Sequence, residues 1–219
     1  MKKTKYSESI VAAIKNCLTN NDQKYLFDEK TGAFVFGLRI RSKLKKISYI
    51  IYVHEEEYTV YAISPMGVNV DNHDTMCKMA EFICRANLGL RNGNFELDVN
   101  DGEIRYKTYV DCEGGVAPAE GVIENSIHCS AIMFDYYARG IIDVISGNID
   151  AKNAVEKCEN SLEETLRELF GDELDDFEGL DDLINESADS SEEKPECEST
   201  DFNHAHIKMD LFGSEGGVA

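Results

Sequence analysis

The sequence predicts an α+β fold: an antiparallel sheet, made of a three-strand meander and a later hairpin, with helices packed on one face. Apolar residues alternate over 34–40, occupy both faces of 46–54 and recur over 57–64, and they alternate again on both sides of a turn at 100–102. Apolar residues at helical spacing precede, separate and follow these strands. The connections between the first three strands are short and polar, which favours antiparallel neighbours.

The chain begins with an amphipathic helix and continues into the meander. Residues 5–19 place Ile10 and Ile14 at helical spacing, and the polar run 19–22 ends this helix. Segment 46–54 is the most apolar of the three strands that follow, because both of its faces carry apolar residues.

A second helix is expected after Asp71 or Asn72, either of which can cap it. Its buried stripe is predicted to comprise Met76, Met79, Ala80, Ile83 and Asn87 or Leu90, widened by Cys77, Cys84 and Leu88. The hairpin comes next, with alternating residues up to Val99 before its turn and from Ile104 after it.

Two further helices complete the ordered part of the chain. Pro118 stands where a first helical position is expected, and a helix is predicted over 119–146. Another begins near Asp150, and its apolar pattern is lost at Gly171. These patterns divide the chain into an α+β domain at 1–170, with this last helix as an addition, and a tail at 171–219.

The negative charge of the 219-residue chain is concentrated near its C-terminus. Of the net charge of −20, −17 lies between Glu159 and Ala219, where 20 acidic residues accompany three basic ones. Residues 171–219 are therefore expected to form an acidic, mostly disordered tail, interrupted by two apolar islands around Phe177 and Phe212 that have the size of docking motifs. A charge of this sign argues against nucleic-acid and membrane binding.

Cysteine usage and the lack of targeting signals predict a cytoplasmic protein. Seven cysteines, an odd number without a C-x-x-C pair, suit reduced thiols. The N-terminus has no signal-peptide pattern, and no apolar run approaches the roughly 20 residues that a membrane span needs.

One weak metal-binding pattern lies on the second predicted helix. His73, Cys77 and Cys84 can share a helix face, as zinc ligands do. A fourth ligand would have to come from His128 or Cys129. The two helix cysteines are better explained as small core residues, so the sequence predicts no metal site and no cofactor.

Catalytic patterns are equally weak. Cys112 or Cys129 could act as a nucleophile with His128 as base, but nothing in the sequence would orient the imidazole. Gly114 and Gly115 are not followed by the Lys and Ser or Thr of a phosphate-binding loop. The protein is therefore predicted not to be an enzyme.

One stretch of the sequence has a family resemblance. Residues 86–110 combine a helix ending in Asn and Gly, a Phe-x-Leu-Asp element at 95–98, and a strand of alternating Arg, Tyr and Thr. With the order helix, three strands, helix, hairpin and helix, this pattern resembles the YbjN family, whose fold is shared with class I type III secretion chaperones. The likeness covers residues 5 to about 147. It implies a bacterial α+β sandwich, often dimeric, and the chaperone relatives hold client segments along the sheet.

The resulting hypothesis is a non-enzymatic, chaperone-like module that binds a protein or peptide client. The strand at 46–54 can direct one set of apolar residues to the helices, yet its other face is apolar too, and apolar residues on both faces usually mean that both are covered. The candidate partner-binding residues on that second face are Val35, Ile50, Tyr52, Tyr61 and Ile63. A client, or a second copy in a homodimer, would cover them.

Three alternatives stay open at this point. The helix from Asp150 could fold over the same face of the sheet. The apolar islands of the tail could dock there and be displaced by a client, so that the tail modulates binding. From another class, a regulatory or sensory protein that binds a small ligand or a metal is the main rival.

Overall fold

The structure, a computed structural model, describes residues 5–170, with side chains as far as residue 161. These residues belong to one unit, Met1–Gly171. The predicted acidic tail at 171–219 lies outside the described residues.

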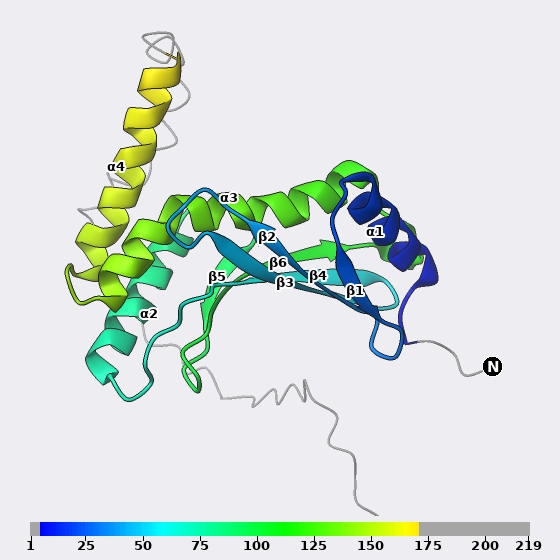
Figure 1. Ribbon diagram of the computed structural model, residues 1–219, viewed down its shortest axis with the longest axis horizontal. Helices are drawn as coiled ribbons and strands as arrows, with labels where there is room; N and C mark the ends of the chain where they lie inside the picture. The colour runs from blue at the N-terminus through cyan, green and yellow to red at the C-terminus, as the bar shows by residue number, and fades with distance from the viewer. Residues whose placement is uncertain (1–4, 171–219) are drawn as a thin grey trace, which may run out of the picture. The chain divides into compact units, whose positions relative to one another are not determined.

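A six-stranded antiparallel sheet forms the centre of this unit and confirms the predicted α+β class (Figure 1). The strand order across the sheet is β1-β2-β3-β4-β6-β5. The strands are β1 (Tyr25–Asp28), β2 (Ala33–Arg39), β3 (Lys46–Val53), β4 (Glu57–Ile63), β5 (Asn94–Leu97) and β6 (Ile104–Asp111). Strands β2, β3 and β4 form the predicted meander, and β5 and β6 form the predicted hairpin.

Four α-helices and a short 3-10 turn complete the described part of the chain. They are α1 (Glu8–Asn20), α2 (His73–Asn87), the 3-10 turn η1 (Glu113–Gly115), α3 (Glu120–Ile145) and α4 (Ala151–Phe170). Helices α1 and α3 lie on the same face of the sheet, and α3 runs along most of its length (Figure 1). Asn72 caps α2, because its side-chain oxygen accepts a hydrogen bond from the backbone N–H of Thr75 (3.1 Å).

The core lies between the sheet and the helices α1 and α3. Alternate residues of β3 and β4 point into it, as the two-residue period of a strand requires, and these positions are fully buried. Tyr49 links the two layers: its hydroxyl donates to the carbonyl of Ile127 (3.1 Å) and accepts from Ser130 (3.0 Å). The buried polar atoms of this contact therefore satisfy one another.

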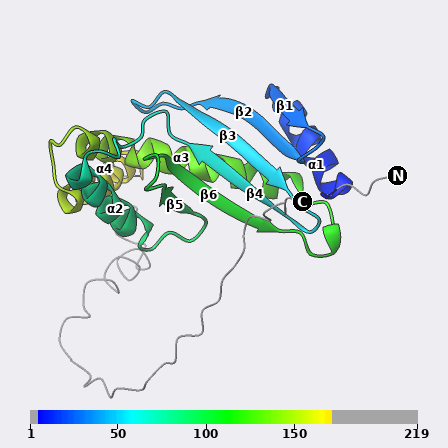
Figure 2. The ribbon, with the colours of Figure 1, turned by 90° about the horizontal axis from the view of Figure 1, so that it is seen from below.

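Helices α2 and α4 and the C-terminal part of α3 pack together at one end of the sheet (Figures 1 and 2). The three helices meet at Gly140, where an added Cβ would lie 2.5 Å from the Phe82 ring of α2 and 3.0 Å from the Cys158 sulfur of α4. The expectation that the helices pack on one face of the sheet thus holds for α1 and α3. Helices α2 and α4 instead bury their apolar sides against α3 and against each other.

Two strand features differ from the sequence-based expectations. Strand β1 was not predicted, because four residues are too few to reveal an alternating pattern; it pairs with β2 as the sheet edge. Val99 was expected to belong to the hairpin strand but lies in the turn with 67% of its surface exposed. The side chain of Asp98 accepts a hydrogen bond from the backbone N–H of Asn100 (2.8 Å), which ends the strand early.

Two helix features also differ. Pro118 precedes α3 by two residues instead of occupying its first position, since Ala119 is the capping residue. On α2, Cys77 and Cys84 are exposed, so their interpretation as core residues is wrong. The helix is rotated so that Phe82 contacts α3, which turns both cysteines toward solvent.

Candidate functional site

The sheet surface opposite α1 and α3 is the first candidate site, and we call it the open face. No described helix lies over it, as Figure 2 shows from below, where the strands stand in front of α3. The outward residues of β2, β3 and β4 include all five predicted partner-binding residues. Val35 is 44% exposed and Tyr52 39% exposed, while Ile50, Tyr61 and Ile63 are half-buried.

Strand register joins apolar side chains into a continuous row across the open face. Leu26 of β1 pairs with Val35. Val35 in turn pairs with Ile50, and Ile50 pairs with Tyr61 of β4. Neighbouring strands are about 4.8 Å apart, so the row extends over roughly 15 Å. The Tyr52 ring lies edge-on to Tyr61, with centroids 6.2 Å apart, and broadens the row on one side.

Basic side chains border this row on β6. Lys107 is paired in register with Tyr61, and Arg105 with Ile63. The Arg105 guanidinium lies over the Tyr61 ring, 4.7 Å from its centroid. Glu96 of β5 forms ion pairs with Arg105 (2.8 Å) and Lys107 (3.7 Å), and Glu103 forms a further ion pair with Arg105 (3.6 Å), so two carboxylates offset the two basic charges. The open face therefore has an apolar centre and a border of paired basic and acidic side chains.

Helix α4 does not cover the open face, which removes one of the alternatives left by the sequence. Its first turns are buried through Ala151, Val155 and Cys158, and its neighbours are α2 and α3. Figure 1 shows α4 rising from the end of the unit on the α3 side of the sheet.

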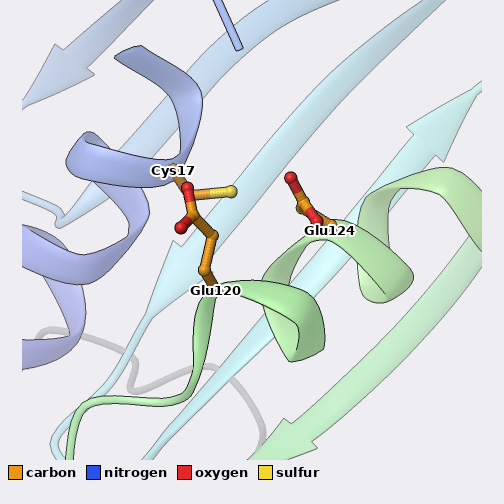
Figure 3. A group of neighbouring side chains, drawn as sticks. All are labelled: Cys17, Glu120 and Glu124. Carbon is orange, nitrogen blue, oxygen red and sulfur yellow. The ribbon is translucent and has the colours of Figure 1, made fainter. Parts of the chain in front are cut away.

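A second candidate site lies where α1 meets the start of α3. Cys17 of α1 faces Glu120 and Glu124 of α3 (Figure 3), and one donor atom of each residue lies within 4.8 Å of the other two. The carboxylates are held by amides of α1 and its C-cap: Asn20 donates to Glu120 (2.8 Å) and Asn21 donates to Glu124 (3.0 Å). Each of these hydrogen bonds occupies one carboxylate oxygen.

Within residues 5–161, whose side chains the structure describes, no basic side chain forms an ion pair with this Cys17 cluster. The ion pairs found among the described residues involve neither Glu120 nor Glu124. The thiol is 2% exposed, and burial together with the two nearby carboxylates raises the pKa of Cys17 to about 11. The cluster thus holds a neutral thiol beside two carboxylate side chains.

A small cavity adjoins the cluster. It has a volume of about 150 Å³ and is lined by Cys17, Glu124 and His128, together with apolar residues of β2. Glu120, Glu124 and His128 follow one another at four-residue steps, so they share one side of α3. This space is large enough for an ion with a few waters and too small for most organic cofactors.

The weak zinc pattern considered on α2 forms only in part. The Cys77 sulfur lies 3.6 Å from a ring nitrogen of His73, and both residues are exposed. Cys84 is two helical turns further along, about 10 Å away along the axis, so it cannot share an ion with this pair. The suggested fourth ligands, His128 and Cys129, belong to α3 and are not grouped with them.

The suggested nucleophile and base do not assemble into a catalytic pair. Cys129 donates a hydrogen bond to the backbone carbonyl of Asn92 (3.5 Å), and its sulfur also contacts the Tyr106 hydroxyl (3.9 Å). His128 lines the cavity next to Cys17, away from these groups. Cys112 is buried at the end of β6, and burial raises its pKa, which disfavours a reactive thiolate.

The comparisons with protein-family models and with curated proteins find no match. The likeness to the YbjN family and to type III secretion chaperones therefore stays a prediction. Within the described residues, no helix combines the length and apolar character of a membrane span.

Proposed function

We propose that the protein is a non-enzymatic, chaperone-like binding module that holds an extended segment of a protein or peptide client on its open face. The observation that carries this proposal is the apolar row across four strands, which no described element covers. A contiguous apolar surface of this kind is typical of interaction sites in folded domains.

The composition of the open face defines the chemistry of its client. Covering a partly exposed aliphatic or aromatic side chain contributes on the order of 1 kcal/mol. A handful of such side chains supports weak, reversible binding, as expected of a surface that captures and releases segments. Lys107 and Arg105 can bind acidic residues that accompany the apolar residues of a client, in exchange for their ion pairs with Glu96 and Glu103.

The acidic tail meets the same chemical description. Residues 171–219 lie outside the described part of the chain, but their sequence joins acidic runs to apolar islands. In this proposal the tail competes with clients for the open face and lowers their apparent affinity. A second copy of the chain is another occupant of the same surface, and sedimentation of the full chain over a range of concentrations reports it.

The proposal is tested with a labelled, permanently unfolded probe protein and fluorescence polarisation. Val35→Glu places a charge in the centre of the row at an exposed position, so the fold tolerates it. The loss of one apolar contact and the desolvation of the new carboxylate correspond to about tenfold weaker binding or more.

The matched control for this variant is Ile132→Glu. Ile132 is 59% exposed on α3, in the opposite layer of the molecule, and the same change there leaves binding unaltered. Equal binding by both variants and the parent chain would remove the open face as the client site.

The rival class, a regulatory protein that binds a small ligand or a metal, depends on different residues. A ligand that stays with the purified chain and is unaffected by Val35→Glu would favour it over client binding.

A further inference from the structure

We propose that Cys17, Glu120 and Glu124 bind a divalent transition-metal ion of the zinc class, which links α1 to the first turns of α3. This site is independent of the open face, which lies on the other side of the sheet.

The donor set suits such an ion. A thiolate and two carboxylates supply three ligands of two types that Zn²⁺ takes in proteins, at about 2.3 Å for sulfur and about 2.0 Å for oxygen. Tetrahedral ligands at these lengths are about 3.3–3.5 Å apart. The donor atoms of the cluster already lie within 4.8 Å of one another. Side-chain rotations that move the donor atoms by about 1 Å therefore complete the tetrahedral geometry.

The burial and hydrogen bonds around the cluster also suit cation binding. Cys17 is 98% buried. Its sulfur accepts one weak hydrogen bond, from the Asn21 amide at 4.0 Å, and the S–H donates to no described group. The amides of Asn20 and Asn21 fix one oxygen of each carboxylate and leave the other oxygen for a ligand. Hydrogen bonds of this kind orient the ligands in protein metal sites.

Electrostatics favour occupation as well. The ion pairs among the described residues involve neither of the two carboxylates that stand beside the thiol, and a divalent ion would neutralise them while stabilising the thiolate. Coordination forms a sulfur–metal bond and releases the thiol proton to solvent. Cys17 and Glu124 also line the cavity of about 150 Å³, which has room for a water molecule as a fourth ligand.

The consequence for the protein is a cross-link between elements that are distant in sequence. Cys17 and Glu120 are separated by about a hundred residues, and α1 otherwise rests on α3 and the sheet through apolar contacts and a few hydrogen bonds. A bound ion would stabilise the docked position of α1 in proportion to its affinity.

The test uses Co²⁺ as a spectroscopic substitute for Zn²⁺ with the reduced full chain. Thiolate coordination gives a near-ultraviolet charge-transfer band, which carboxylate or imidazole binding alone does not produce. We expect this band to saturate at one ion per chain. Cys17→Ser should abolish it. Glu124→Gln, which keeps the acceptor for Asn21, should weaken binding at least tenfold.

Two matched controls separate this site from other thiols. Cys112→Ser removes another buried thiol, and Cys77→Ser removes the exposed thiol beside His73. Both variants should retain the band. A full chain without the band, a band that persists in Cys17→Ser, or an unchanged affinity in Glu124→Gln would each overturn the proposal.

Discussion

The packing at Gly140 gives the sharpest prediction for stability. Alanine has the higher helix propensity, and replacing a helical glycine by alanine normally stabilises a protein by up to about 1 kcal/mol. At Gly140, however, the new Cβ would lie 2.5 Å and 2.8 Å from two atoms of the Phe82 ring and 3.0 Å from the Cys158 sulfur. These contacts are too short for the neighbours to remain in place.

The neighbours of Gly140 have little room to move. Phe82 is fully buried and lies edge-on to Tyr137, with centroids 6.0 Å apart. Overpacking of such a site costs about 1–3 kcal/mol. After the gain in helix propensity, Gly140→Ala should lower the free energy of unfolding by about 1–2 kcal/mol, because α2 and α4 must shift away from α3.

Gly121 supplies the control on the same helix. No atom lies within 4 Å of its added Cβ, so Gly121→Ala should leave the free energy of unfolding unchanged or raise it by up to about 1 kcal/mol. Urea denaturation of both variants measures the difference, which corresponds to midpoints about 1 M apart for a slope of about 2 kcal/mol per M. A Gly140→Ala protein as stable as Gly121→Ala would refute the close packing of the three helices, and with it the position of α4 away from the open face.

Three further predictions concern the buried tyrosines, the contact between α2 and β5, and residues 172–219. Burial raises the pKa of Tyr49 and of Tyr58 to about 12. The free energy of unfolding that these two tyrosines contribute is therefore complete below pH 10 and is lost between pH 10 and 12. The loss is up to about 1.4 kcal/mol per pH unit for each tyrosine. Urea titrations at pH 9 and 11 measure this loss, and Tyr49→Phe should reduce it; an equal pH dependence in that variant would contradict the assignment. The Asn87 side chain donates a hydrogen bond to the backbone carbonyl of Phe95 (2.9 Å) and accepts one from its backbone N–H (2.7 Å). Asn87→Ala should therefore lower the free energy of unfolding by about 1–3 kcal/mol. An unchanged free energy of unfolding would show that β5 does not need these two hydrogen bonds. Deletion of residues 172–219 should increase binding of the unfolded probe, measured by polarisation, whereas unchanged binding would exclude competition by the tail.

Much of the sheet was predictable because its strands are long enough to show their period. The two-residue period of a strand puts Tyr49 and Ile50 of β3 on opposite faces, and the structure places Tyr49 in the core and Ile50 outward as expected. The open-face residues follow from the same rule. Strand β1 did not follow from it, since four residues show too little of the pattern.

The orientation of α2 and the Cys17 cluster lay beyond what the sequence could reveal. Apolar residues on α2 extend to both sides of its central stripe, and only contact with α3 and α4 decides that Phe82 is buried and Cys84 exposed. The four-residue spacing of Glu120, Glu124 and His128 was a visible signal, but spacing of this kind is common on exposed helices. The partner thiol comes from a helix about a hundred residues earlier, so the cluster exists only through the tertiary fold.

The most direct test of the central claim, that the open face binds client segments, is site-specific photo-crosslinking in the full chain. A photoreactive amino acid replaces Tyr52 on the open face, which is 39% exposed, or Ile132 on the outer side of α3, which is 59% exposed, so the control position is the more accessible of the two. After incubation with the unfolded probe and illumination, we expect an adduct from position 52 and little or none from position 132. Adducts of equal yield from both positions, or from position 132 alone, would contradict the claim.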